Sequence, residues 1–300
     1  MVVLLPLSNL SFFSILVCCF FFTWRSANGS KFTFINKCKN TVWPGILSNS
    51  DSPPLPTTGF ELPTGTRRSF QSPTGWSGRF WARTGCAFSK PTNLFTCSTG
   101  DCGSGTLECS GAGANPPATL AEFTLGKNGG KDFYDVSLVD GYNLPMVVDV
   151  TSTIDECLST GCSVDLNRVC PVKLRVRNGD ACRSACEAFG RPEYCCSGVF
   201  SNPNTCQPSV YSRMFKSACP RSYSYAYDDA TSTFTCTSAD YEVTFCPGGG
   251  QSLANATGAG VWLTNVVRGD APITRKRFSP FRQAFVSAST IFIFDLLFRY

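Results

Sequence analysis

Sixteen cysteines lie between Cys38 and Cys246, and they restrict the fold of this chain more than any other feature. Two more, Cys18 and Cys19, fall in the apolar N-terminal run. An even number of scattered cysteines behind a leader-like segment is typical of a disulfide framework formed in an oxidising compartment. Zinc sites use closely spaced Cys-x2-Cys pairs, which are absent here, so no metal site is predicted. Spacing alone leaves about two million pairings open.

The 300 residues contain no histidine, which excludes several kinds of active site. A Ser-His-Asp triad, a Cys-His pair, a His-ligated zinc and an imidazole base all need this side chain. Acid–base chemistry would therefore rest on Asp, Glu, Tyr or Lys. No cofactor is predicted.

The net charge of +5 does not come from the cysteine-rich region. Between residues 30 and 247, Lys and Arg are as numerous as Asp and Glu, and the excess comes from Arg25 and from the chain after Pro247. Nucleic acid binding needs clustered positive charge, so it is disfavoured.

The two ends of the chain differ in composition from the middle. Residues 2–24 are mostly apolar and the small residues near Gly29 suit signal peptidase, so residues 1–29 are predicted to be a signal peptide. A retained membrane anchor is the alternative. The protein is thus expected outside the cell, in the apoplast.

Residues 248–300 are predicted to be a flexible or processed C-terminal extension. They begin with three glycines and contain no cysteine. Asn255 begins an Asn-x-Thr glycosylation sequon. Sorting to the vacuole by this extension is an alternative to secretion, and a lipid anchor is disfavoured because the terminal apolar run is short and contains Asp295.

Short runs rich in strand-forming residues, separated by Gly, Pro, Ser and Asn, indicate a mainly β chain. The expected strands are residues 32–36, 79–83, 120–125, 133–139 and 241–245. Helical periodicity is scarce. Its best candidate is residues 180–189, with Asp180 as the N-cap and Gly190 as the terminator.

Several segments resemble the landmarks of the thaumatin-like proteins, a family of plant pathogenesis-related and sweet proteins. They include Gly-Arg-Phe-Trp at 78–81, Leu-Ala-Glu-Phe at 120–123, Phe-Tyr-Asp at 133–135 and Tyr-Cys-Cys at 194–196, within residues 32–247. One departure is Asn93, where the family has Gly. Asn tolerates a positive φ, so the turn is expected to survive.

The resemblance implies a flattened antiparallel β-sandwich with two disulfide-rich excursions. The sandwich would comprise residues 30–83, 118–163 and 220–247 of a domain spanning 30–247. A small disulfide hairpin region would occupy residues 84–117 and a disulfide-rich helical insert residues 164–219. The implied disulfides are Cys38–Cys246, Cys86–Cys97, Cys102–Cys109, Cys157–Cys236, Cys162–Cys219, Cys170–Cys182, Cys186–Cys195 and Cys196–Cys206.

The family has an acidic cleft described by one Arg, one Glu and three Asp. Matched motif by motif, these residues are Arg79, Glu122, Asp135, Asp140 and Asp228. Asp229, next to Asp228, leaves the last match ambiguous by one position. Strand alternation puts Glu122 and Asp135 on the solvent side of their strands. Asp140 has the wrong parity and can join them only through a bend at Asp140-Gly141.

The resemblance implies a secreted defence protein that binds fungal β-1,3-glucan in this cleft and inhibits fungal growth. Weak endo-β-1,3-glucanase activity is a second reading, with Glu122 as the acid and Asp135 or Asp140 as base or nucleophile. Binding without turnover is favoured, because no aromatic platform can be placed, although Phe133 and Tyr142 are candidates. A third reading is a non-catalytic stress or wall protein that acts on membranes or receptors. The protein is expected to be a monomer.

Overall fold

The computed structural model describes residues 29–151, 156–176 and 179–248. Residues 1–28 of the predicted signal peptide, the extension from residue 249 and the sequon residue Asn255 lie outside these ranges. Among the described residues, no helix is both long enough and apolar enough to cross a bilayer.

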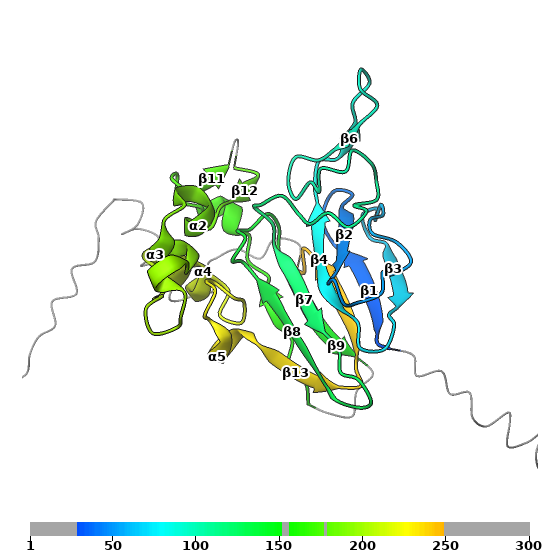
Figure 1. The fold of residues 1–300 in the computed structure, drawn as a ribbon. Helices are drawn as coiled ribbons and strands as arrows, with labels where there is room; N and C mark the ends of the chain where they lie inside the picture. The colour runs from blue at the N-terminus through cyan, green and yellow to red at the C-terminus, as the bar shows by residue number, and fades with distance from the viewer. Residues whose placement is uncertain (1–28, 152–155, 177–178, 249–300) are drawn as a thin grey trace, which may run out of the picture.

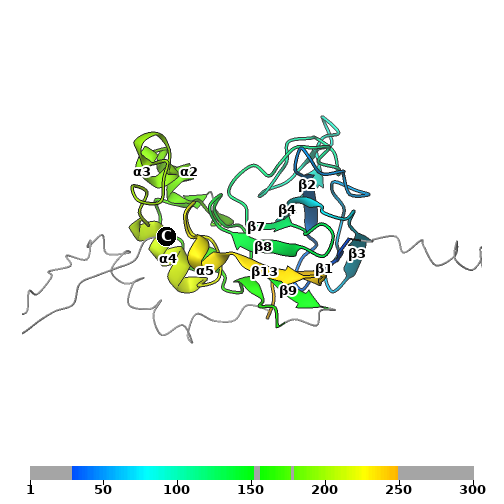
Figure 2. The same ribbon diagram turned by 60° about the horizontal axis from the view of Figure 1, so that its bottom comes forward.

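Two five-stranded sheets form a sandwich (Figures 1 and 2). The first has the order β10 (Thr160–Cys162), β9 (Met146–Thr151), β14 (Asp240–Phe245), β1 (Lys31–Asn36) and β3 (Arg67–Gln71). The second has the order β13 (Phe234–Thr237), β8 (Lys131–Ser137), β7 (Leu120–Thr124), β4 (Ser77–Arg83) and β2 (Trp43–Ser48). The predicted mainly β sandwich is confirmed.

One strand pair departs from the expected antiparallel arrangement. β1 and β14, near the two ends of the domain, run parallel, with Asn36 opposite Phe245. The pairing brings the residues just beyond both strands together, and Cys38 and Cys246 are bonded there. The disulfide therefore fastens the first and last strands of the sandwich at the same end.

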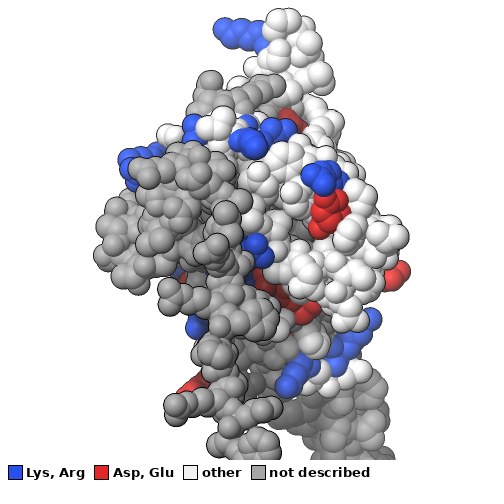
Figure 3. Space-filling view, turned by 90° about the vertical axis from the view of Figure 1, so that its left-hand side faces the viewer, with Lys and Arg blue, Asp and Glu red and all other residues white. Residues whose placement is uncertain are grey.

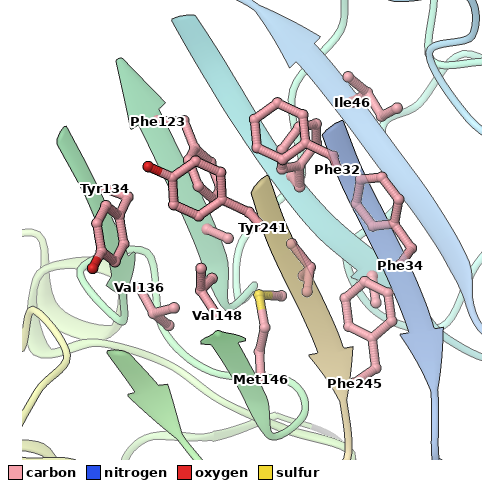
Figure 4. Packing of buried hydrophobic residues seen from close by; sticks show 14 of the residues in the cluster. Phe32, Phe34, Ile46, Phe123, Tyr134, Val136, Met146, Val148, Tyr241 and Phe245 are labelled. Atoms are coloured by element: carbon pink, nitrogen blue, oxygen red, sulfur yellow. The ribbon is translucent and has the colours of Figure 1, made fainter. Parts of the chain in front are cut away.

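The core between the sheets is largely aromatic (Figure 4). Phe32 on β1 contacts Phe80 on β4 and Phe123 on β7, with ring centroids 4.9 and 4.8 Å apart. Tyr241 on β14 meets Phe123 at 5.0 Å. These side chains are buried because they lie on the inner faces that the alternation of their strands creates.

The outer face of the second sheet is covered at one end by the loops that follow β4. Trp81 is fully buried there with Leu120 and the Cys102–Cys109 disulfide, and its Nε1 donates to the Gly100 carbonyl at 2.8 Å. A Cβ on Gly45 would lie 2.4 Å from the Trp81 ring, so this position in β2 admits only glycine. The short hairpin of β5 (Ala87–Phe88) and β6 (Phe95–Thr96) projects beyond these loops (Figure 1).

The insert after β10 carries most of the helices, which gather at one end of the sandwich together with α5 (Asp229–Ser232) (Figures 1 and 2). Its elements are η1 (Leu166–Val169), β11 (Arg175–Val176), β12 (Ala181–Cys182), α2 (Ala185–Phe189), α3 (Pro192–Cys195), η2 (Gly198–Phe200) and α4 (Val210–Ala218). It has its own core, which includes Leu166, Leu174 and Phe215.

The predicted helix at 180–189 is shorter than expected. It begins after Ser184, whose side chain accepts from the Glu187 amide, and it ends at Gly190 with a φ of 61°. Asp180 was the wrong N-cap, because residues 181–182 form β12 and pair with β11. The strand expected at 133–139 is likewise displaced, since β8 spans Lys131–Ser137.

The sixteen cysteines of the domain are joined in the same eight pairs that the resemblance implies. Seven of them have sequence separations of at most 79. Two of these lie within the hairpin region and three within the insert, Cys162–Cys219 joins the insert to the sandwich, and Cys157–Cys236 lies within the sandwich. Asn93, which replaces the family's glycine, has a φ of 51°, so it keeps the left-handed turn as expected.

Candidate functional site

A row of charged side chains crosses three neighbouring strands of the second sheet. Arg79 on β4 lies directly opposite Glu122 on β7, and Glu122 lies opposite Asp135 on β8. All three side chains are on the outer face of the sheet. Arg79 is two residues before the covered Trp81 on β4, and Glu122 is two residues after the covered Leu120 on β7, so each pair lies on the same face. The row begins where the covering loops end, so its side chains remain half-exposed.

Asp140 reaches the same region through a turn. The turn is needed because Asp140 is an odd number of residues from Asp135 and would point to the opposite face of a straight strand. The Gly141 amide donates to the Leu138 carbonyl, and Gly141 has a φ of 84°. A Cβ on Gly141 would lie 2.7 Å from Pro117 Cβ and 2.8 Å from the Cys182 carbonyl oxygen. Two hydrogen bonds of 2.8 Å between Tyr142 and Cys182 fix the end of the turn to the insert. Glycine is therefore needed at 141 to place Asp140.

Asp229, and not the predicted Asp228, lines this region. The Asp228 carboxylate accepts hydrogen bonds from the Ser224 amide and hydroxyl and forms an ion pair with Lys216 at 3.0 Å. Asp229 accepts a hydrogen bond of 2.9 Å from the Tyr223 hydroxyl. The sequence left this match ambiguous between the two residues, and their carboxylates make different contacts at the start of α5, so that only Asp229 lines this region.

These residues form one pocket of about 290 Å³, here called the acidic groove. It is lined by Arg79, Leu120, Glu122, Asp135 and Ser137 of the sheet, Val139 and Asp140 of the turn, and Tyr223, Ala226 and Asp229 of the segment leading into α5. The structure thus brings four of the five predicted residues together and adds Asp229.

Asp135 is the carboxyl with the most perturbed titration in the acidic groove. Burial, together with the nearby charges of Glu122 and Asp229, raises its pKa to about 8, against a smaller opposite effect of Arg79. Its Oδ2 atom is buried and has no hydrogen-bond partner among the described residues. The raised pKa therefore favours the protonated form of Asp135 at neutral pH.

Glu122 is half-exposed and faces Arg79. Burial raises its pKa, Arg79 lowers it, and Asp140 raises it. The Arg79 Nε and Glu122 Oε1 atoms are 3.7 Å apart, and each side chain is about one third exposed, at 36% and 35%. An ion pair of this kind contributes little to stability, so both groups remain available to a ligand.

The two aromatic residues proposed to stack on a sugar, Tyr142 and Phe133, differ in their exposure to solvent. Tyr142 is fully buried, and its hydroxyl donates to the Val164 carbonyl at 2.9 Å, so it belongs to the core. Phe133 is 49% exposed and lies on the same strand face as Asp135, although it does not line the acidic groove.

Charge on the face drawn in Figure 3 is mixed. Among the described residues on this face, blue Lys and Arg side chains and red Asp and Glu side chains are interspersed. In the part of the chain that the structure describes, no group of three or more His, Cys, Asp or Glu could hold a metal ion.

The family comparison and the similar proteins agree on one family. The pattern of the Thaumatin family matches residues 36–247. A thaumatin-like protein 1 of Arabidopsis thaliana is 60% identical over 249 residues, covering 80% of this chain and 96% of its own length. Pathogenesis-related protein 5 of the same plant is 52% identical over 244 residues, covering 80% of this chain and all of its own.

Among solved structures, a laminaripentaose-producing β-1,3-glucanase in complex with laminaritetraose aligns with a TM-score of 0.49 and 12% identity. The alignment covers 73% of this chain and 98% of the glucanase.

Proposed function

The chain belongs to the thaumatin family, and we propose from this premise that it is a secreted defence protein that binds fungal β-1,3-glucan in the acidic groove and inhibits fungal growth. The defence role is supported by its relatives, two of which are named pathogenesis-related proteins, from Cryptomeria japonica and Arabidopsis thaliana. The side chains of the groove support the ligand class.

The observation that carries the proposal is the gathering of Glu122, Asp135, Asp140 and Asp229 in one open groove. Carboxylates repel an anionic ligand but accept hydrogen bonds from the hydroxyls of a neutral polysaccharide. A protonated Asp135 can also donate one. Such a surface suits an uncharged sugar chain, and β-1,3-glucan is the neutral wall polymer that we propose.

A pull-down on insoluble β-1,3-glucan tests the proposal. We expect the Asp135→Asn/Asp140→Asn variant to be retained at least tenfold less than the wild type, because each substitution replaces a carboxyl oxygen in the groove by an NH₂ group that cannot accept a hydrogen bond. The charge-matched control is Asp51→Asn/Glu61→Gln, which changes two exposed residues outside the groove and should bind like the wild type. Equal retention of all three proteins would exclude the groove as the binding site.

Secretion is the second part of the proposal, and the eight disulfides support it because such bonds persist in oxidising compartments. We expect the mature protein to begin at Ser30 and to lack free thiols in the domain. Mass spectrometry of the secreted protein, before and after alkylation without reduction, measures both. The same spectrum reports whether residues 248–300 are retained and whether Asn255 carries a glycan. A mature chain that retained residues 1–29 would contradict secretion by this route.

Weak endo-β-1,3-glucanase activity is the second candidate, and the perturbed carboxyl pair favours it. The sequence predicted Glu122 as the acid. Burial raises the pKa of both carboxyls, but Arg79 opposes this shift at Glu122, whereas the pKa of Asp135 rises to about 8, so Asp135 is the better candidate for the proton donor. Opposed residues on neighbouring strands have Cβ atoms about 4.5–5.5 Å apart. Carboxyls on positions opposed in this way can approach the separation of about 5–5.5 Å that a retaining reaction uses.

Binding remains the leading candidate because Glu122 and Asp135 project from the same sheet face, whereas a retaining pair must flank the scissile bond. Release of reducing sugar from laminarin separates the two functions. An enzyme should lose at least a hundredfold of its activity in Glu122→Gln and in Asp135→Asn. Wild-type protein that binds glucan but releases no sugar would leave binding as the function.

A further inference from the structure

A second pocket adjoins the acidic groove on the side of the helical insert. It lies between α2, α3, α4 and the segment before α5, has a volume of about 360 Å³, and is here called the insert pocket. Val139, Asp140 and Ala226 line both the insert pocket and the acidic groove. The two cavities are therefore neighbouring parts of one cleft, and a chain-like ligand in one can continue into the other.

The insert pocket has the lining that a sugar subsite needs. Tyr211 and Tyr225 contribute aromatic surface to it, and both are half-exposed. Aromatic rings offer large, rigid apolar faces at little entropic cost, which suits the apolar face of a pyranose ring. The volume lies within the range of small-molecule sites, about 300–1,000 Å³.

Glu187 supplies an unused polar group in the insert pocket. Its Oε2 atom is buried and has no hydrogen-bond partner in the described residues. It lies close to Gly141, 3.2 Å from where a Cβ on that residue would be, and so next to Asp140 at the junction with the groove. A buried carboxyl oxygen without a partner is costly, and a ligand hydroxyl would satisfy it.

The protonation of Glu187 fits an uncharged ligand. Its pKa is raised to about 7: burial and the charge of Asp140 raise it, while Arg183 and a hydrogen bond from the Ser184 backbone oppose the shift. Near neutral pH a large share of the Glu187 side chains is therefore neutral. In that form the carboxyl can both donate and accept a hydrogen bond, which suits sugar hydroxyls because they too are both donors and acceptors.

We propose that the insert pocket is a second sugar subsite, in which Tyr225 and Glu187 hold the glucose units of a β-1,3-glucan chain that extends out of the acidic groove. This proposal rests on the function proposed above. It predicts that affinity depends on chain length, because only a ligand long enough to occupy both cavities contacts Tyr225 and Glu187.

Calorimetric titration with laminari-oligosaccharides of two to six glucose units tests the subsite. Wild-type affinity should rise at least tenfold across the series. Tyr225→Ala and Glu187→Ala should each weaken binding of the hexasaccharide about tenfold, equivalent to about 1.4 kcal/mol, while binding of the disaccharide stays within twofold. Circular dichroism melting of each variant identifies any loss that comes from unfolding.

Phe88→Ala is the matched control, because Phe88 is an exposed aromatic residue on the distant β5–β6 hairpin. It should bind every oligosaccharide like the wild type. Folded Tyr225 and Glu187 variants with the wild-type length dependence would overturn the subsite and leave the acidic groove intact as a binding site. Wild-type protein that binds no member of the series would overturn the proposed function, and the subsite with it.

Discussion

Asp135 illustrates how an individual residue acquires its chemistry from its neighbours. A carboxyl on the solvent side of a strand would ordinarily be ionised at neutral pH. Here burial raises the pKa most, the negative charges of the cross-strand Glu122 and the nearby Asp229 add to the shift, and the pKa reaches about 8. Alternation predicts the side of the strand on which Asp135 lies, but not the approach of Asp229, which comes from a segment almost a hundred residues away.

The titration of Asp135 predicts an unusual effect of mutation on stability. Its folded-state pKa lies above the unfolded value near 3.8, so ionisation disfavours the folded state increasingly as pH rises from about 4 to 8. Asp135→Asn removes this penalty. We expect little change in the free energy of unfolding at pH 3.5 and a gain on the order of 2 kcal/mol at pH 7, discounted for the partly exposed carboxyl.

Urea unfolding of the two proteins at both pH values measures this difference. Asp51→Asn, at an exposed position, is the control and should show no such pH dependence. A variant less stable than the wild type at pH 7 would show that Asp135 is ionised and stabilising in the folded protein. Because the expected variant is more stable, any loss of glucan binding by it cannot come from unfolding.

At the scale of an element, the segment between α4 and α5 is held in place by one partly buried ion pair. Lys216 on α4 pairs with Asp228 and also donates to the Ser222 carbonyl at 3.1 Å and the Ser232 hydroxyl at 2.7 Å. Asp228 in turn accepts from Ser224. These contacts position the segment that presents Tyr223, Tyr225 and Asp229 to the cleft.

Asp228→Asn is predicted to loosen this segment. It leaves the Lys216 ammonium, only 24% exposed, without its counter-charge, and we expect a loss of about 2–3 kcal/mol in the free energy of unfolding. Glucan binding should weaken as well, although Asp228 does not line the acidic groove. Denaturant unfolding and the glucan pull-down measure the two effects.

Asp240→Asn serves as the control, because the Asp240 carboxylate pairs with Lys31, whose side chain is 50% exposed, at 3.6 Å. It should cost less than about 1 kcal/mol. An equal loss in the free energy of unfolding for the two variants would mean that the contacts of Asp228 do not hold the segment between α4 and α5 in place.

Strands with regular alternation, such as β1, β7 and β14, were predictable as elements because their apolar and polar residues repeat at period two. β2 was not expected, since it contains Pro44 and Gly45. It tolerates Pro44 because it is the edge strand of its sheet. The start of α2 was missed because both Asp180 and Ser184 are good N-cap residues, and only the pairing of β12 with β11 decides between them.

At the scale of the whole molecule, the Cys38–Cys246 disulfide closes the largest loop, with a sequence separation of 208. The family resemblance implied this pair, whereas spacing left all pairings open. The parallel pairing of β1 with β14 gives its physical basis, but that pairing could not be predicted from either strand alone. The insert pocket was also beyond sequence reasoning, because its lining comes from three helices and a turn.

Removal of single disulfides should show that the bond closing the longest loop contributes most to stability. In the chain-entropy account, loss of Cys38–Cys246 costs about 5 kcal/mol and loss of Cys86–Cys97, with a separation of 11, costs about 3 kcal/mol. We expect Cys38→Ser/Cys246→Ser to lower Tm by about 10–20 °C. Cys86→Ser/Cys97→Ser should lower it by about half as much. Equal decreases in calorimetry would contradict the dominance of the long-range bond.

The most direct test of the account is a titration of laminarihexaose into ¹⁵N-labelled protein, followed by amide chemical shifts. Bound glucan should shift the amides of Glu122, Asp135, Asp140 and Asp229 and leave those of the β5–β6 hairpin unchanged. Shifts confined to the hairpin or to other surfaces, or no shifts at millimolar ligand, would contradict the claim that the acidic groove is the glucan site.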